Sequence, residues 1–195
     1  MEKKEALENL NTKWKEECQC ELKKTATQAV FGVGNAETEI VFIGEAPGKS
    51  EDQKGEPFVG AAGKFLNEML ELINMKREDI YITNIVKYRP PNNRDPEPSE
   101  KAACRAWLLE ELKIISPKLI IFLGRHAMNN FFPELQIGKA HGKLLIKPFK
   151  DMSTKYFFPL YHPAAALYDG SMREVLKDDF KKIPKVLKEI EKRQA

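Results

Sequence analysis

The sequence predicts an α/β fold in which a parallel sheet is covered by helices on both faces. Four short apolar runs recur along the chain, and stretches with helical spacing separate them. The runs are rich in Ile, Val, Phe and Tyr and barely alternate with polar residues, which is typical of strands buried on both sides. Strands that alternate with helices indicate parallel strands joined by helical crossovers. Because 195 residues without internal repeats suit one core, we expect a single domain over residues 1–195.

The predicted elements follow one another in a regular order. The apolar runs predict strands at residues 39–44, 80–86, 119–124 and 156–161. A charged amphipathic segment predicts an N-terminal helix at about 3–20, and apolar residues three and four apart predict helices at 63–73 and 99–115. Ser99 is the expected N-cap of the helix at 99–115, and Pro184 is expected to kink or break a last helix at about 171–193.

Composition limits the function classes only broadly. The net charge is +3, which is too mild to require a nucleic-acid partner and is compatible with one. No apolar run approaches the ~20 residues that a membrane-spanning helix needs, and the N-terminus carries no apolar signal-peptide core. The three cysteines are too few, and odd in number, for a disulfide framework. We therefore expect a cytoplasmic protein that is not associated with a membrane.

Polar residues of types suited to catalysis or ligand binding stand where the predicted strands end. Glu45 follows the first strand, Asn84 closes the second, and His162 follows the fourth. In an open parallel sheet the ligand lies beyond the carboxyl ends of the strands, so these three side chains are expected to converge on one site. Each of them alone is also compatible with a structural role, such as a cap or a tied-down turn. His126 and His141 are interpreted as structural or surface residues.

Several common catalytic motifs are absent from the sequence. The loop "GEAPG" after the first strand has neither the Gly-Lys-Ser/Thr of a phosphate-binding P-loop nor the spacing of a dinucleotide-binding loop. The chain contains no G-x-S-x-G element, which argues against a serine hydrolase. No pair of histidines has the spacing of zinc ligands.

Five motifs together resemble the family 4 uracil-DNA glycosylases. "GEAPGKSED", "GEPFVGAAG", "YITNIVKYRPPNNRDP", "LGRHA" and "YHPAAAL" stand in the order and at the spacing of that family, and the resemblance runs from about Cys20 to the C-terminal helix. It implies a three-layer α/β/α sandwich around a four-stranded parallel sheet. It also implies a monomer that acts on uracil-containing DNA, hydrolysing the N-glycosidic bond of a flipped-out uracil and leaving an abasic site.

The resemblance assigns roles to residues at matching motif positions. Phe58 is expected to stack on the uracil ring, and Asn84 to accept from N3–H and donate to O4. His162 is expected to donate to O2 as negative charge develops there. Glu51 matches the position that crowds the C5 edge against a thymine methyl group. Glu45 and the backbone of Ala46 line the water and sugar side. Some glycosylase families place a catalytic Asp at the position of Ala46, so the general base is left open.

DNA contacts are expected from loops around the same site. Lys87, Arg89, Asn93 and Arg94 supply donors and positive charge for phosphates. Leu167, after "HPAAA", is the candidate wedge that fills the gap left by the flipped base.

The sequence departs from this family at its iron–sulfur ligands. Family members usually hold a [4Fe–4S] cluster with four cysteines. Cys20 and Cys104 match two ligand positions, but Tyr88 and Glu17 stand at the other two, and Cys18 is displaced by one residue. We therefore expect no cofactor. The alternative is that Cys18, Cys20 and Cys104 still hold iron.

Other functions were weighed against uracil excision. The nearest alternative is a glycosylase for another deaminated base such as hypoxanthine. A relative that becomes covalently trapped on DNA carries a histidine-bearing insert, and "NNRDPEPSE" has no histidine. A non-catalytic nucleic-acid-binding module is a further alternative, against which Glu45, Asn84 and His162 all argue.

Overall fold

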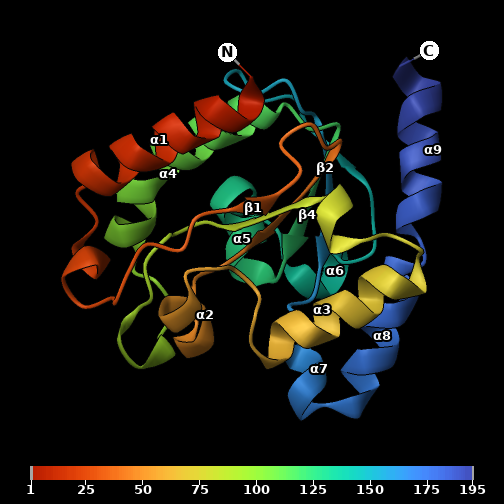
Figure 1. Cartoon of the computed structure of the whole chain (residues 1–195). Helices are drawn as coiled ribbons and strands as arrows, with labels where there is room; N and C mark the ends of the chain where they lie inside the picture. The colour runs from red at the N-terminus through yellow and green to blue at the C-terminus, as the bar shows by residue number, and fades with distance from the viewer. Residues whose placement is uncertain (1, 195) are drawn as a thin grey trace.

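The computed structural model describes residues 2–194 and contains one six-stranded sheet (Figure 1). The strands are β1 (Val33–Gly34), β2 (Ile40–Gly44), β3 (Tyr81–Asn84), β4 (Leu119–Leu123), β5 (Leu145–Ile146) and β6 (Tyr156–Leu160), in the spatial order β1-β3-β2-β4-β6-β5. The neighbours β3, β2, β4 and β6 pair in parallel, whereas β1 and β5 pair antiparallel on the two edges. The sheet is thus larger than the predicted four-stranded one. The edge strands were missed because two residues carry no periodic signal.

Helices cover both faces of the sheet. The α-helices are α1 (Lys3–Glu17), α2 (Lys49–Lys54), α3 (Ala61–Leu72), α4 (Pro98–Ile115), α5 (Arg125–Phe131), α6 (Ile137–Ala140), α7 (Ala165–Tyr168), α8 (Gly170–Phe180) and α9 (Ile183–Gln194). Single 3₁₀ turns lie at Glu21–Lys24, Arg77–Asp79 and Pro91–Asn93. One apolar cluster joins the sheet to α1, α4 and α5, and a second joins the opposite face to α3, α8 and α9. The result is a sheet between two helical layers.

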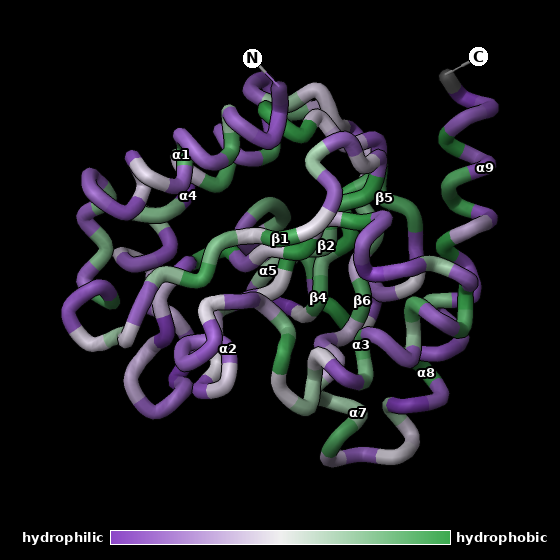
Figure 2. The backbone as a smooth tube through the Cα atoms, in the orientation of Figure 1, coloured by the Kyte–Doolittle hydropathy of each residue, from purple (hydrophilic) through white to green (hydrophobic). Residues whose placement is uncertain are grey.

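The central strands are buried completely because both of their faces are covered. Along β2, Val41 and Ile43 point into the cluster under α1, α4 and α5, while Phe42 points into the other cluster. All five residues of β4 are buried, as the unbroken apolar run predicted. Figure 2 shows the corresponding pattern, with hydrophobic strands inside and largely hydrophilic outer helices. Among the described residues, no helix is both long enough and apolar enough to cross a membrane.

Two predicted helix boundaries are corrected. The predicted N-cap Ser99 lies inside α4, which begins at Pro98 with Glu97 before it. Glu97 donates its backbone N–H to Glu100 Oε2 at 2.7 Å, and proline is favourable in the first turn because its φ is preset. The predicted helix at 171–193 is two helices, α8 and α9. The break lies just before Pro184, which confirms the predicted break and places Pro184 in the first turn of α9.

A buried ion pair joins the end of β3 to α4. The side chains of Lys87 and Glu111 are both fully buried, with Lys87 Nζ 2.8 Å from Glu111 Oε2. Lys87 also donates to the backbone carbonyl of Asn84 at 3.0 Å and to Thr83 Oγ1. Tyr81 donates its hydroxyl to the other oxygen of Glu111 at 3.0 Å. The prediction that Lys87 contacts DNA is therefore wrong, because its ammonium group is sealed inside the protein.

We expect the protein to lose much of its stability when only one partner of this ion pair is removed. In the Lys87→Met variant, Glu111 stays buried without its cation, and breaking a buried pair in this way costs about 3–5 kcal/mol. Urea denaturation should show that loss, and a Lys87→Met/Glu111→Leu double variant should recover part of it. The control is Lys113→Met, which removes an exposed pair with Glu110 on the same helix and should cost under ~1 kcal/mol. Equal effects of Lys87→Met and Lys113→Met would contradict the prediction.

Candidate active site at the carboxyl end of the sheet

Loops after β2, β3 and β6 enclose a cavity of about 380 Å³. It lies beyond the carboxyl ends of the parallel strands, where open α/β sheets bind their ligands. The structure brings Glu45, Asn84 and His162 together here from distant positions in the chain. The lining residues are Glu45, Ala46, Pro47, Gly48, Glu51, Phe58, Ala62, Asn84, Pro90, Asn93, Arg94, Asp95, His162, Ala164 and Tyr168.

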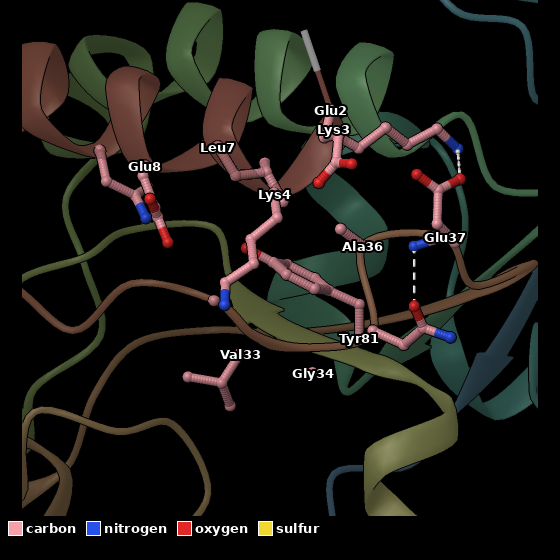
Figure 3. Close-up of a pocket in the computed structure, with 13 residues that line it drawn as sticks. Glu2, Lys3, Lys4, Leu7, Glu8, Val33, Gly34, Ala36, Glu37 and Tyr81 are labelled. Carbon is pink, nitrogen blue, oxygen red and sulfur yellow. Dashed lines mark hydrogen bonds and ion pairs between the residues drawn. The ribbon is translucent and has the colours of Figure 1, made fainter.

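A larger cavity of about 710 Å³ lies elsewhere, between α1 and residues 32–37 (Figure 3). Tyr81, which lines it, opens β3, so this cavity lies away from the carboxyl end that Asn84 occupies. Lys3 crosses it to pair with Glu37 at 3.1 Å. None of the site residues predicted from the sequence lines this cavity, and we therefore place the candidate active site at the smaller one.

Asn84 presents an unused hydrogen-bond acceptor to the site. Its side chain is 2% exposed, and its Oδ1 has no hydrogen-bond partner among the described residues. A buried acceptor costs roughly 1–3 kcal/mol unless a group donates to it, so this oxygen is available to a ligand N–H or to water in the cavity. Gly44 makes room for this amide, because a Cβ there would lie 2.4 Å from Asn84 Oδ1 and 2.6 Å from Phe58 Cζ.

His162 is held as a neutral imidazole with a fixed tautomer. The backbone N–H of Ala164 donates to His162 Nδ1 at 3.1 Å, so the ring proton is on Nε2. Burial lowers the pKa of His162 to about 4. The ring stacks near Phe58, with centroids 5.7 Å apart. His162 is therefore a neutral donor at physiological pH.

Phe58 is held in place by two charged side chains from other elements. Its φ of 54° is in the left-handed region, which is strained for an aromatic residue. Arg77 Nη1 donates to the Phe58 carbonyl at 3.0 Å, and Arg77 Nη2 donates to the Pro57 carbonyl. Glu51 Oε1 accepts from the N–H groups of Val59 and Gly60 at 2.9 and 2.8 Å. No sequence signal distinguished Arg77, which lies in an ordinary charged stretch.

Glu51 lines the cavity as the sequence predicted, but one of its oxygens is already committed. The hydrogen bonds to Val59 and Gly60 place its carboxylate at the start of α3. Negative charge is favourable there because the helix dipole is positive at its N-terminus. Only the second oxygen is left to face a ligand, and its predicted role at the C5 edge stays a prediction.

Glu45 is a partly buried carboxyl group with a raised pKa. Burial, followed by the nearby carboxylate of Asp95, raises the pKa of Glu45 to about 7. His126 Nε2 lies 3.0 Å from Asp95 Oδ2 and 3.9 Å from Glu45 Oε2. The sequence-based interpretation of His126 as a structural or surface residue did not anticipate that it lies close to Glu45 and Asp95. His141 is remote from the cavity and pairs with buried Asp179 at 2.6 Å.

The residues predicted to contact DNA differ in their exposure and in whether their side chains are already bonded to other residues. Arg89 donates to Asn93 Oδ1 at 2.7 Å on the cavity rim, and Arg94 is paired with Glu100 at 2.6 Å. Leu167 is 43% exposed on α7. The next residue, Tyr168, is 91% exposed and lines the cavity, although no sequence signal distinguished it.

Comparison with known proteins agrees with this arrangement. Residues 31–188 match the family model described as the uracil DNA glycosylase superfamily. The chain belongs to that superfamily. A type-4 uracil-DNA glycosylase of Archaeoglobus fulgidus is 50% identical over 169 residues, which cover 84% of each chain. Another from Sulfurisphaera tokodaii is 47% identical over 170 residues, covering 84% of this chain and 77% of that protein, and one from Saccharolobus solfataricus is 47% identical over 180 residues, covering 87% and 82%.

The iron–sulfur cluster typical of the family 4 enzymes does not fit the residues present. Cys18, Cys20 and Cys104 are all buried together with Tyr88, so Cys18 reaches the group despite its displaced position. Cys18 and Cys20 donate to backbone carbonyls at 3.6 and 3.9 Å, and the neighbouring Cys104 lowers the pKa of both thiols. Burial and the adjacent thiols raise the pKa of Tyr88 to about 12, which makes its phenol a poor ligand. Three thiols and a neutral phenol do not make the usual four-thiolate set.

One further group has the geometry to hold a metal ion. Among residues 2–194, the ligand atoms of Glu45, Asp95 and His126 all lie within 4.8 Å of one another. Arg125 lies against this group, with Nε 3.0 Å from His126 Nε2 and Nη2 3.5 Å from Asp95 Oδ2. A permanent positive charge at that distance disfavours a metal cation. We therefore interpret the group as an acid–base cluster.

We expect NMR to find His162 neutral far below the usual histidine range. Its ring signals should titrate near pH 4 and should have the ¹⁵N shifts of the Nε2–H tautomer. An unfolded histidine titrates near 6.5, so the folded state binds fewer protons below that pH. The stability from His162 is therefore complete above about pH 6.5 and is lost as the pH falls towards 4. Since the chain has three histidines, a His162→Gln variant identifies the signal. A titration near 6.5 would contradict the assignment.

Proposed function

We propose that this chain is a uracil-DNA glycosylase that hydrolyses the N-glycosidic bond of a uracil flipped out of DNA. The observation that carries the proposal is the pairing of an unpartnered buried acceptor on Asn84 with a neutral Nε2–H donor on His162, across one cavity beside Phe58. Relatives that are 47–50% identical over most of the chain are named type-4 uracil-DNA glycosylases.

The cavity accounts for the choice of uracil over cytosine. Phe58 would stack on the base, while Asn84 would accept from N3–H through Oδ1 and donate to O4 through Nδ2. Cytosine presents an acceptor at N3 and a donor at C4, so the same amide orientation would leave both contacts unpaired. Each buried unpaired group costs about 1–3 kcal/mol, which supports discrimination by Asn84.

The remaining polar groups suit the cleavage step. As the C1′–N1 bond breaks, its electron pair moves to the base, and His162 would donate from Nε2 to the developing charge on O2. A donor aimed at such a charge in a dry site is worth about 2.7–4 kcal/mol. A water molecule gives hydroxide to C1′ and its proton to the carboxylate of Glu45. The pKa of Glu45, about 7, suits proton transfer near neutral pH.

We propose DNA contacts from the rim of the cavity. Arg89, Asn93 and Arg94 lie near the bound strand, and Leu167 on α7 would fill the gap left by the base. The three cysteines are free thiols, which supports a reducing compartment such as the cytoplasm.

Uracil release from a labelled oligonucleotide, followed by alkaline cleavage, tests the function. The wild-type protein should cut at uracil and spare cytosine. Asn84→Asp should lose at least roughly 5- to 150-fold in single-turnover rate, because a carboxylate cannot donate to O4 and 1–3 kcal/mol is forfeited. The control is Asn74→Asp, which adds the same charge at an exposed left-handed turn. Full activity in Asn84→Asp would remove Asn84 from base recognition, and no release by the wild type would end the proposal.

We also propose that the enzyme works without an iron–sulfur cluster. Protein prepared without oxygen should be colourless and should contain no stoichiometric iron. The Tyr88→Phe variant should be as stable as the wild type or more stable, because the Tyr88 hydroxyl is buried and has no partner among the described residues. Visible iron–sulfur absorption that Tyr88→Phe abolishes would instead make Tyr88 a ligand.

A further inference from the structure

The loop after β4 brings a histidine to the catalytic carboxyl group. Gly124 takes a φ of 97°, and α5 then begins with Arg125 and His126. His126 Nε2 lies 3.0 Å from Asp95 Oδ2 and 3.9 Å from Glu45 Oε2. The roles proposed above use the loops after β2, β3 and β6 and leave this fourth loop without one.

The surroundings of His126 Nε2 suit both of its protonation states. When Nε2 is unprotonated, it accepts from Arg125 Nε at 3.0 Å. When the ring is protonated, its Nε2 forms an ion pair with Asp95 Oδ2 at the same distance. The ring lies against the otherwise exposed Asp95 side chain, whose carboxylate stays within 4.8 Å of Glu45 and His126.

We propose that Asp95 and His126 are positioning residues that set the protonation of Glu45, with His126 holding the Asp95 carboxylate in place. The inference rests on the proposed function, because Glu45 is taken as the acceptor of the water proton. Asp95 keeps Glu45 partly protonated near neutral pH, and the rate of base release then follows the ionised fraction of Glu45.

The charged groups around Glu45 act on its ionisation in both directions. Asp95 opposes ionisation of Glu45, whereas Lys101 on α4 and Arg125 on α5 favour it. Across the cavity, His162 is neutral, Glu51 is bonded to the Phe58 loop, and Arg94 is paired with Glu100. Burial is the larger cause and Asp95 adds to it, and together they raise the pKa of Glu45 to about 7.

The test is the pH dependence of single-turnover uracil release. Since Glu45 must be ionised, the wild-type rate at pH 6 should be about one tenth of the rate at pH 8. Asp95→Asn removes a negative neighbour, so its rate should fall off only at lower pH and its pH 6 to pH 8 ratio should rise several-fold. The control is Asp178→Asn, which neutralises an exposed aspartate paired with Lys181 on α8 and should leave the profile unchanged.

Variants of His126 test the holding role separately. His126→Ala frees Asp95 to turn into solvent and should shift the profile as Asp95→Asn does, with no further shift in the double variant. His126→Gln can still donate to Asp95 and should keep the wild-type profile. If His126→Ala does not fold, Asp95→Asn and His126→Gln decide the question. An unchanged profile in Asp95→Asn, with normal uracil release by the wild type, overturns the inference and leaves the proposed function intact, whereas no release by the wild type overturns both.

Discussion

The buried contact between Lys87 and the backbone of Asn84 is the constraint on which the site depends. An ammonium group in a dry core is stable only when it is paired, and Glu111 on α4 supplies the partner. The same ammonium donates to the Asn84 carbonyl, which fixes the turn at the end of β3. Replacing such a pair by apolar residues is often neutral for stability, so stability alone does not explain it. Its donation to the Asn84 carbonyl gives the ammonium group a second role, at the end of β3.

Burial acts on the two titratable groups of the site in opposite directions. Removal from water disfavours the charged form of any group, so the pKa of His162 falls to about 4 and that of Glu45 rises to about 7. The consequence is one neutral donor and one carboxyl group that titrates near neutral pH. A charged histidine would be a stronger donor, but it would also require a buried cation in the free enzyme. The neutral ring is available without that cost.

The sequence was sufficient for what depends on local pattern. Continuous apolar runs located β2, β3, β4 and β6, and the parallel arrangement then placed Glu45, Asn84 and His162 at one end of the sheet. The sequence was insufficient to predict contacts between residues that lie far apart along the chain. Nothing near Lys87 reveals Glu111, which lies 24 residues later, and nothing near Phe58 reveals Arg77. A lysine two residues before an arginine, as in Lys87-Tyr88-Arg89, has the signature of a phosphate contact whether it is exposed or buried.

The cysteine group lies next to the contact that holds the end of β3, but it does not take part in it. Tyr88 follows Lys87 directly, so adjacent side chains serve two separate purposes. Lys87 points to Glu111 and holds Asn84, while Tyr88 packs with Cys18, Cys20 and Cys104. Because Lys87, and not a cysteine, donates to the Asn84 carbonyl, the residue at position 88 does not take part in the contact that holds the end of β3. The aromatic ring also fills volume that a smaller side chain would leave empty, and filled volume preserves stability.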